Sequence, residues 1–347
     1  MRRIRVLAVD DSALMRNLLS TIVSQQPDME MVGTAPDPII AREMIKKLNP
    51  DVLTLDVDMP RMDGLEFLSR LMRLRPMPVV MISSLTTRGS KATLAALEQG
   101  AVDFLPKPDH QVAGDLDRWA QLVVEKLRIA AKAKPGTQHG GQAIRPLLSG
   151  SRAAQESLIA IGASTGGTEA LRRVLMPLPV DCPGIVIAQH MPSGFTRSFA
   201  QRMDSLCQIT VREAEDEEPI SPGSALIAPG DRHLEIVRRG KGYVVRLSDA
   251  PAVNRHRPSV DVLFDAVAQQ AGRHASAALL TGMGSDGARG LLNLRQAGAY
   301  TLAQSEATCV VFGMPREAIA LDAACEVADL DDIGARLLES FSRKKHK

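Results

Sequence analysis

The chain has 347 residues, of which 45% are hydrophobic, and a formal net charge of +2. This length predicts two domains, and the near-neutral charge argues against a nucleic-acid-binding protein. No apolar run reaches the roughly 20 residues that a membrane-spanning helix needs, and the N-terminal segment is too short and too acidic for a signal peptide. We therefore expect a cytoplasmic protein that does not insert into membranes.

Apolar strands and amphipathic helices alternate from the N-terminus to about residue 132. Strict alternation of this kind predicts a parallel sheet with helices on both faces, which is an α/β fold. Ligands of such sheets bind at the carboxyl ends of the strands. The predicted strands are 4–9, 29–35, 52–55, 79–83 and 101–105, and the predicted helices are 13–25, 38–48, 64–73, 90–99 and 115–132.

Polar side chains lie at the carboxyl ends of these strands. Asp10 and Asp11 follow the first strand, and Asp56 follows the third. Three carboxylates at one sheet edge repel one another unless a cation lies among them, and oxygen ligands suit Mg²⁺. Ser83 and Lys107, at the ends of the fourth and fifth strands, suit a phosphoryl group, which a carboxylate can accept as a nucleophile. The alternative is that the aspartates cap a helix and the lysine neutralises them, but the full set favours phosphoryl chemistry.

The strand ends lie in three segments, Val-Asp-Asp-Ser, Leu-Asp-Val-Asp-Met-Pro-Arg-Met-Asp-Gly and Leu-Pro-Lys-Pro. Together these segments resemble the receiver domain of two-component response regulators. The resemblance implies a flavodoxin-like fold in which Asp56 takes a phosphoryl group from a histidine kinase. It also implies that Asp11, Asp56 and the backbone of Asp58 hold Mg²⁺, with Asp10 supporting the site.

The same resemblance assigns roles to three residues on the fourth and fifth strands and just beyond them. Ser83 and Lys107 are expected to contact the phosphoryl group. Phe104 stands where the family carries an aromatic ring that moves on activation.

Residues 133–156 are rich in glycine and proline and show no apolar period. Such a composition is typical of a flexible linker. We therefore predict a first domain at 1–132, a linker at 133–156 and a second domain at 157–347.

The second domain returns to an α/β pattern, for which we predict a doubly wound, mostly parallel sheet. Its middle section differs, because short strands there are joined by proline and glycine turns. This section predicts an antiparallel hairpin region at one edge of the sheet. The predicted parallel strands are 158–161, 184–188, 276–280 and 300–303, and the short strands of the middle section are 209–213, 224–228, 234–238 and 243–247.

Ser164 lies in Gly-Ala-Ser-Thr-Gly, between an apolar strand and a helix that is predicted to begin near Thr168. This segment fits the Gly-x-Ser-x-Gly pattern of a nucleophile elbow. The N–H groups of the following helix can stabilise an oxyanion there. The alternative is a serine that only caps this helix.

A serine nucleophile needs a base and a group that orients the base. His190 follows an apolar strand and so lies at the same sheet edge as Ser164, while His233 and His256, on loops, also remain possible. Asp286 follows another apolar strand at that edge. The chain order Ser164, His190, Asp286 differs from that of α/β-hydrolases, but a triad is defined by geometry and not by order.

A second pattern in this region points to a different chemistry. Gly282, Gly284 and Gly287 fit the Gly-x-Gly-x-x-Gly pattern of dinucleotide binding, and Glu306 follows the next strand. Asp286, however, would place a negative charge where the pyrophosphate must approach. A nucleotide-binding oxidoreductase therefore stays open as an alternative.

Five segments of the second domain look like the CheB family of chemotaxis receptor methylesterases. They are Ala-Ile-Gly-Ala-Ser-Thr-Gly-Gly-Thr-Glu-Ala, Gln-His-Met-Pro, Ala-Pro-Gly-Asp-Arg-His, Asn-Arg-His-Arg-Pro-Ser-Val-Asp and Leu-Thr-Gly-Met-Gly-Ser-Asp-Gly. The resemblance implies a catalytic triad of Ser164, His190 and Asp286. It implies oxyanion donors in the backbone N–H groups of Met283 and His190, Met283 being the better one, with Thr165 beside the nucleophile.

The resemblance also implies an activity. Such an enzyme removes methyl groups, as methanol, from glutamate methyl esters of chemoreceptors and deamidates particular receptor glutamines, with no cofactor in the catalytic domain. A histidine kinase would be the phosphodonor, and phosphorylation of Asp56 would open the active site. Two further alternatives are a receiver joined to a DNA-binding module, which would need a basic helix-turn-helix, and a non-catalytic adaptor in which Ser164 is only a cap.

Overall fold

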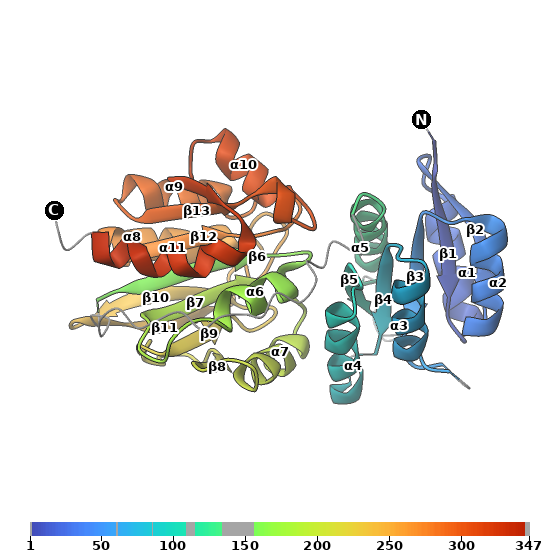
Figure 1. Cartoon of the computed structure of the whole chain (residues 1–347), viewed down its shortest axis with the longest axis horizontal. Coiled ribbons are helices and arrows are strands. Elements are labelled where there is room, and N and C mark those ends of the chain that lie inside the picture. Colours follow the sequence, from blue (N-terminus) through green and yellow to red (C-terminus); the bar gives the residue numbers. More distant parts are fainter. Residues whose placement is uncertain (1, 60–61, 85, 109–114, 134–155, 344–347) are drawn as a thin grey trace. The chain divides into compact units, whose positions relative to one another are not determined.

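The computed structural model describes residues 2–59, 62–84, 86–108, 115–133 and 156–343. The chain divides into two compact units, Met1–Gly141 and Gln142–Lys347, and each is built on a sheet with helices packed against it (Figure 1). Except for its two end residues, the predicted linker lies outside the described residues.

The first unit is a five-stranded parallel sheet, as the alternation predicts, and its strands lie in the order β2-β1-β3-β4-β5. Helix α4 begins three residues earlier than predicted because the Thr86 hydroxyl accepts a hydrogen bond from the Gly89 N–H and so caps it. The strands are β1 (Ile4–Val9), β2 (Met29–Ala35), β3 (Val52–Asp56), β4 (Val79–Ser83) and β5 (Asp103–Pro106), and the helices are α1 (Ala13–Ser24), α2 (Pro38–Leu48), α3 (Gly64–Leu74), α4 (Thr87–Glu98) and α5 (Asp115–Ala130).

The second unit is built on a seven-stranded sheet in the order β14-β13-β12-β6-β7-β9-β8, in which every strand pair is parallel. A separate antiparallel pair, β10-β11, forms its own sheet. The strands are β6 (Leu158–Ala163), β7 (Gly184–Gln189), β8 (Thr210–Glu213), β9 (Ser224–Ile227), β10 (His233–Arg239), β11 (Gly242–Ser248), β12 (Ala275–Leu279), β13 (Tyr300–Gln304) and β14 (Glu326–Ala328).

The predicted antiparallel region is confirmed for β10 and β11 and wrong for β8 and β9, which extend the parallel sheet. The connection between β8 and β9 explains the difference. It runs beside β11, where the Glu217 N–H bonds the Val245 carbonyl and the Ile220 N–H bonds the Tyr243 carbonyl. Because this connection carries the chain back to the end of the sheet at which β8 begins, β9 runs in the same direction as β8.

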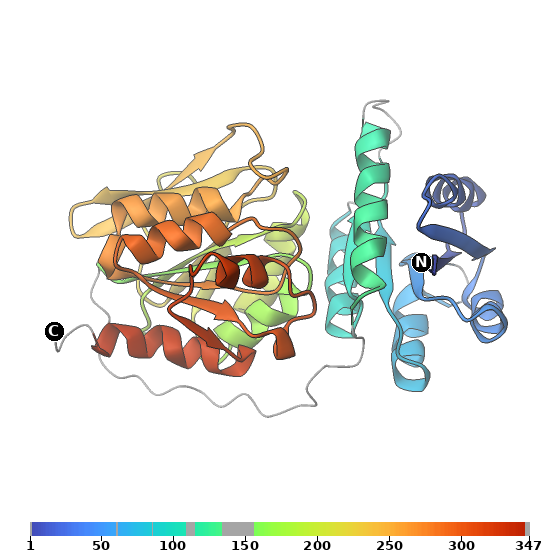
Figure 2. The ribbon, with the colours of Figure 1, turned by 90° about the horizontal axis from the view of Figure 1, so that it is seen from above.

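Helices cover both faces of this second sheet. Helices α8 and α9 pack together on one face, where α8 also contacts β10, and α6 and α11 pack together on the other (Figure 2). Among the described residues, none of the helices has the length and apolar character that crossing a membrane requires. The helices are α6 (Gly167–Leu175), α7 (Phe195–Asp204), α8 (Val260–Gln270), α9 (Ala288–Gln296), α10 (Met314–Ala320) and α11 (Leu330–Arg343), with short 3₁₀ turns η1 (Gly272–His274) and η2 (Glu306–Thr308).

Candidate active site

Ser164 lies at a sharp turn between β6 and α6. Gly166 has φ +77° at this turn, a backbone conformation that side-chain-bearing residues rarely adopt. The Ser164 N–H bonds the Thr281 carbonyl at 3.0 Å, and its own carbonyl accepts the Gly167 N–H at 2.7 Å. The N-cap of α6 is Gly166, with no side-chain cap. The interpretation of Ser164 as a capping serine is therefore wrong, and its hydroxyl is available for another role.

The hydroxyl of Ser164 faces His190. Strand β7 is the parallel neighbour of β6, and its last pair joins Ala163 to Gln189, which places His190 beside Ser164. His190 Nδ1 lies 3.1 Å from Ser164 Oγ, and His190 Nε2 lies 2.7 Å from Asp286 Oδ2. The side chains of His190 and Asp286 are 7% and 1% exposed. The three residues thus form a continuous hydrogen-bonded relay, as predicted.

The Asp286 carboxylate receives hydrogen bonds from several elements. Besides His190, its donors at 2.7 Å are the Asn254 amide, the Ser259 hydroxyl and the Val260 N–H at the start of α8. Burial by itself raises the pKa of Asp286, but the hydrogen bonds from His190, Asn254 and Ser259 outweigh it and hold that pKa well below its usual range. Asp286 is therefore ionised at neutral pH.

The ionised carboxylate determines which ring nitrogen of His190 carries the proton. A carboxylate can only accept, so His190 Nε2 must donate its proton to Asp286. Nδ1 of the neutral ring is then a free lone pair facing the Ser164 hydroxyl. This is the arrangement that a general base needs in order to take the serine proton.

Gln189 fixes the backbone at Ser164 and His190. Its buried amide Nε2 donates to the Ser164 carbonyl at 2.9 Å and to the His190 carbonyl at 3.1 Å. A flipped amide would turn Oε1 against both carbonyls, so the contacts define its orientation. A Cβ at Gly167 would lie 2.1 Å from Oε1 of Gln189 and 2.8 Å from Cβ of Ala163, so a side chain there would displace the Gln189 amide or the end of β6.

The two backbone N–H groups predicted to hold the oxyanion, those of His190 and Met283, differ in whether they already donate a hydrogen bond. The His190 N–H is occupied, because it bonds the Ala163 carbonyl at 3.1 Å and extends the β6–β7 ladder by one residue. That half of the prediction is wrong. In the part of the chain that the structure describes, the Met283 N–H has no acceptor, and its neighbour Gly282 approaches so closely that a Cβ there would lie 2.7 Å from Ser164 Cβ. Thr165 is buried beside Ser164, and its carbonyl accepts a hydrogen bond from the Thr281 hydroxyl.

The other two histidines that the sequence left open are differently placed. His233 is 1% exposed, and its ring bonds the Pro251 carbonyl and the Ser259 N–H, so it supports the loop before α8. The His256 ring stacks on His190. The glycine pattern from Gly282 to Gly287 encloses Asp286, which is buried and bonded to His190. A buried anion opposes pyrophosphate there, so the geometry does not support the dinucleotide interpretation.

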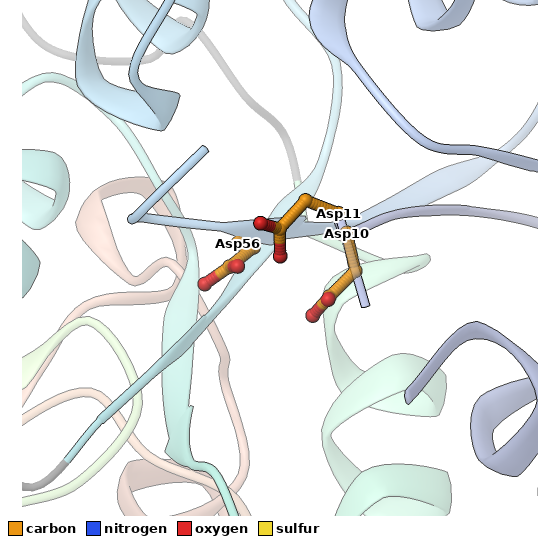
Figure 3. A group of neighbouring side chains, drawn as sticks. All are labelled: Asp10, Asp11 and Asp56. Carbon is orange, nitrogen blue, oxygen red and sulfur yellow. The ribbon is translucent and has the colours of Figure 1, made fainter. Parts of the chain in front are cut away.

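The first unit gathers carboxylates at the carboxyl ends of β1 and β3. Ligand oxygens of Asp10, Asp11 and Asp56 lie within 4.8 Å of one another (Figure 3). Lys107 Nζ lies 2.7 Å from Asp56 Oδ2 and 3.3 Å from Asp10 Oδ2. Burial raises the pKa of Asp56 to about 6 and also raises the pKa of Asp10, although Lys107 opposes both shifts. Asp10 Oδ2 is buried and accepts no aligned hydrogen bond, so the donor set fits a hard cation such as Mg²⁺.

The remaining predicted residues of this unit are Asp58, Ser83 and Phe104. The Asp58 N–H donates to Asp56 Oδ1 at 3.4 Å. The Ser83 hydroxyl is buried and donates to the Gly89 carbonyl, at the edge of the same site. Phe104 is 5% exposed. The indole N–H of Trp119 bonds the Pro106 carbonyl at 2.6 Å, next to Lys107.

Comparison with known proteins identifies the family. The CheB methylesterase family model matches residues 159–337, which is more than half of the chain. The chain belongs to the CheB methylesterase family. A model of the response regulator receiver domain matches residues 6–113, in the first unit of this CheB chain.

Named relatives and a solved structure agree with the CheB assignment. Proteins named protein-glutamate methylesterase/protein-glutamine glutaminase from Escherichia coli K12 and Pectobacterium atrosepticum are 60% and 61% identical, and each match covers 99% of this chain and 98% of the relative. The crystal structure of the Thermotoga maritima CheB methylesterase catalytic domain matches with a TM-score of 0.52 and 39% identity. That match covers 53% of this chain and 97% of the solved one.

Sequence reasoning about this CheB chain missed Asn254, Ser259 and Gln189 as parts of the site. Asn254 and Ser259 lie in the segment Asn-Arg-His-Arg-Pro-Ser, which was noted only as a family motif. The repeated polar residues of that segment, just before an apolar helix with Ser259 at its N-cap, are the signal that could have drawn attention to them. Gln189 is adjacent to His190 but ends a strand, where a buried polar residue gives no periodic signal.

We expect the Asp56→Asn variant of the CheB chain to be more stable than the wild type when divalent cations are absent. Because the pKa of Asp56 is about 6 in the folded state, against an ordinary value of 3.8, the folded state holds its proton more tightly than the unfolded chain does. Stability is therefore lost as pH rises from about 4 through 6, by up to about 3 kcal/mol at roughly 1.4 kcal/mol per pKa unit. Asparagine does not ionise, so the variant should not lose this stability at pH 7.5. At pH 4 its free energy of unfolding should be close to that of the wild type.

Tryptophan fluorescence can measure this effect in the intact chain, because the single tryptophan, Trp119, is buried in the first unit. Unfolding should be followed first in chelator and then with added Mg²⁺. Mg²⁺ should stabilise the wild type more than Asp56→Asn and so reduce the difference between their free energies of unfolding. Asp117→Asn, at an exposed position of α5, is the matched control. Equal stability of Asp56→Asn and wild type at pH 7.5 in chelator would contradict the prediction.

Proposed function

We propose that this CheB chain is a phosphorylation-activated protein-glutamate methylesterase and protein-glutamine glutaminase that acts on methyl-accepting chemotaxis receptors in the cytoplasm. The observation that carries the proposal is the relay of Ser164, His190 and Asp286, with distances of 3.1 and 2.7 Å. It supports acyl transfer in a chain that is 60% identical to a protein with that name. The roles of the individual residues below are part of the proposal.

The first half-reaction forms an acyl-enzyme. His190 Nδ1 takes the proton of the Ser164 hydroxyl as Oγ attacks the ester carbonyl carbon. Asp286 stabilises the imidazolium that forms, and the Met283 N–H donates to the oxyanion. A donor of this kind lowers the barrier by roughly 3–4 kcal/mol. When the carbonyl re-forms, the C–O bond breaks, and the proton on Nδ1 passes to the leaving methoxide to give methanol.

The second half-reaction uses the same groups on water. His190 Nδ1 takes a proton from water, the resulting hydroxide attacks the acyl carbon, and Ser164 Oγ leaves and recovers its proton from His190. The products are a free glutamate side chain and the original enzyme. For a glutamine side chain the leaving group is ammonia, which also needs the proton that His190 holds.

In the first unit, we propose that Asp56 takes a phosphoryl group from a histidine kinase. Asp10, Asp11, Asp56 and the backbone of Asp58 would hold Mg²⁺, whose chemistry is to neutralise the phosphoryl oxygens. Lys107, 2.7 Å from Asp56, would pair with the phosphoryl group. Ser83 would contact it after leaving the Gly89 carbonyl.

We propose that phosphorylation of the first unit regulates ester hydrolysis by the second, because one chain carries both. Phosphorylation of Asp56 would shift the first unit to its active form, with Phe104 as the moving ring, and so open the active site. The matched receiver model within a CheB chain supports this proposal. We further propose that the receiver spans 1–132 and the catalytic domain 157–347, with 133–156 as the linker.

The test is methanol release from methylated receptors with Mg²⁺, in the presence and absence of a small phosphodonor such as acetyl phosphate. We expect the phosphodonor to accelerate the wild type and to leave Asp56→Asn at the unstimulated rate, because an amide cannot form the acyl phosphate. Asp117→Asn, a control at an exposed position, should still respond. Methanol release at the same rate with and without the phosphodonor would refute regulation by phosphorylation but leave the esterase activity supported. No methanol release under any condition would refute both the esterase activity and its regulation.

A further inference from the structure

The faces of the His190 ring need support that the catalytic hydrogen bonds do not provide. Nδ1 faces Ser164 and Nε2 faces Asp286, so both contacts lie in the plane of the ring. Rotation about the Cβ–Cγ bond would break both together. The His256 ring lies flat against His190, with ring centroids 3.7 Å apart and an interplanar angle of 11°. This stacking opposes that rotation.

His256 is held by a tight turn. The His256 N–H bonds the Val253 carbonyl at 2.9 Å, and the Val253 N–H bonds the His256 carbonyl at 3.1 Å. The two residues between them, Asn254 and Arg255, have φ of +52° and +70°. Positive φ at both central positions is typical of a type I′ turn, which favours asparagine and glycine. An arginine there is strained, and such strain persists where the surroundings fix the backbone, often at functional sites.

The turn is tethered to the carboxylate that orients His190. The Asn254 amide donates to Asp286 Oδ1 and to Asp261 Oδ2, both at 2.7 Å. On the other side of His256, the Arg257 guanidinium bonds the carbonyls of Asp249 and Ala250. One carboxylate therefore anchors the base at its edge and also anchors the turn whose histidine covers the face of the base.

We propose that His256 is a positioning residue for His190, a role that rests on the proposed function of that histidine as a base. Its ring keeps His190 in the one orientation that joins Ser164 to Asp286. His256 would act through His190 and would not touch the ester.

The test separates positioning from substrate contact by using two reactions. The first is methanol release from methylated receptor, analysed as kcat and KM. The second is covalent labelling by diisopropyl fluorophosphate, in which Ser164 Oγ bonds phosphorus, fluoride leaves, and His190 takes the serine proton and passes it to solvent. Labelling needs the relay but no receptor, and its absence in Ser164→Ala identifies the labelled atom.

We expect His256→Ala to lower kcat and the labelling rate together, by about 10- to 100-fold, with KM within about twofold, because small misplacements of reacting groups cost that much. His256→Phe should recover most of both rates, since a phenyl ring restores the flat contact. His274→Ala is the matched control, because His274 lies on η1 beside Glu156, away from the relay. Thermal unfolding of each variant should be measured alongside, to establish that it is folded.

Each remaining outcome overturns a distinct claim. Positioning by stacking would be refuted if His256→Ala were labelled at the wild-type rate. It would also be refuted if the alanine and phenylalanine variants lost kcat and labelling rate equally. A raised KM with unchanged labelling would make His256 a substrate contact instead. Labelling without methanol release in the wild type would refute the proposed substrate and leave the positioning test intact. If the wild type could not be labelled, both the proposed function and the positioning role of His256 would be refuted, because His190 would not activate Ser164.

Discussion

Ser164→Ala is expected to reduce methanol release about a million-fold, to the level that binding and the oxyanion donor alone provide. The alanine removes only the oxygen that His190 Nδ1 faces at 3.1 Å, and the pair of His190 and Asp286 remains in place. Ser164 does not cap α6, so we expect the melting temperature to change little. Methanol release from phosphodonor-treated enzyme measures the loss, and thermal unfolding by circular dichroism measures the fold.

Ser205→Ala is the matched control for this substitution. Ser205 lies at the end of α7, and its hydroxyl bonds the Arg202 carbonyl. The control should keep full activity. If Ser164→Ala instead kept its activity and altered only stability, the adaptor interpretation would replace the enzyme.

Asp286→Asn should lower kcat by about four orders of magnitude, as expected when the orienting member of a triad becomes an amide. The carboxylate now accepts from His190, Asn254, Ser259 and the Val260 N–H. An amide offers one oxygen and one NH₂ group. If the NH₂ group faces His190, Nε2 becomes the acceptor and the ring proton moves to Nδ1, which can then no longer take the serine proton.

A cost in stability accompanies this loss. Whichever way the substituted amide turns, it leaves a buried donor without an acceptor, at about 1–3 kcal/mol. Because Asp286 has a pKa well below its usual range, its stabilising effect is present above the pKa of the unfolded chain and is lost as pH falls through the folded pKa. The variant should lack that acid dependence.

Asp265→Asn is the control, since Asp265 lies on α8 and bonds Asn293 away from the relay. Its kcat should be unchanged. A kcat for Asp286→Asn within tenfold of the wild type would show that Asp286 only anchors α8, and the base would then need another partner.

The sequence was most informative where the chemistry lies at strand ends. Strands β6 and β7 are consecutive and parallel, so the residues that follow them must meet at one edge, and this placed Ser164 beside His190. Asp56 also lies beside Asp10, although β1 and β3 are neighbours in the sheet without being consecutive in the chain. Alternation alone does not give that strand order, so the prediction relied on the matching strand ends and on the receiver resemblance.

The errors arose where long-range pairing decides the structure. The direction of β9 depends on a crossover that pairs with β11, which no local period reveals. The His190 N–H was expected to be free, but the ladder between β6 and β7 continues one residue past the strand and uses it. Asn254 and His256 lie in a loop with positive φ, where the contacts depend on tertiary packing and not on propensity.

The hydrogen bond between His190 and Asp286 joins residues that are 96 positions apart in the chain. Ser164, the proposed nucleophile, precedes both of them, so during synthesis it leaves the ribosome long before Asp286, which is proposed to orient its base. Contacts of such long sequence separation form late in folding, because the intervening chain must be ordered first. On the proposed mechanism, Ser164 of a nascent or partly folded chain is therefore inert, and we expect esterase activity to begin only when β6, β7, β12 and α8 have assembled.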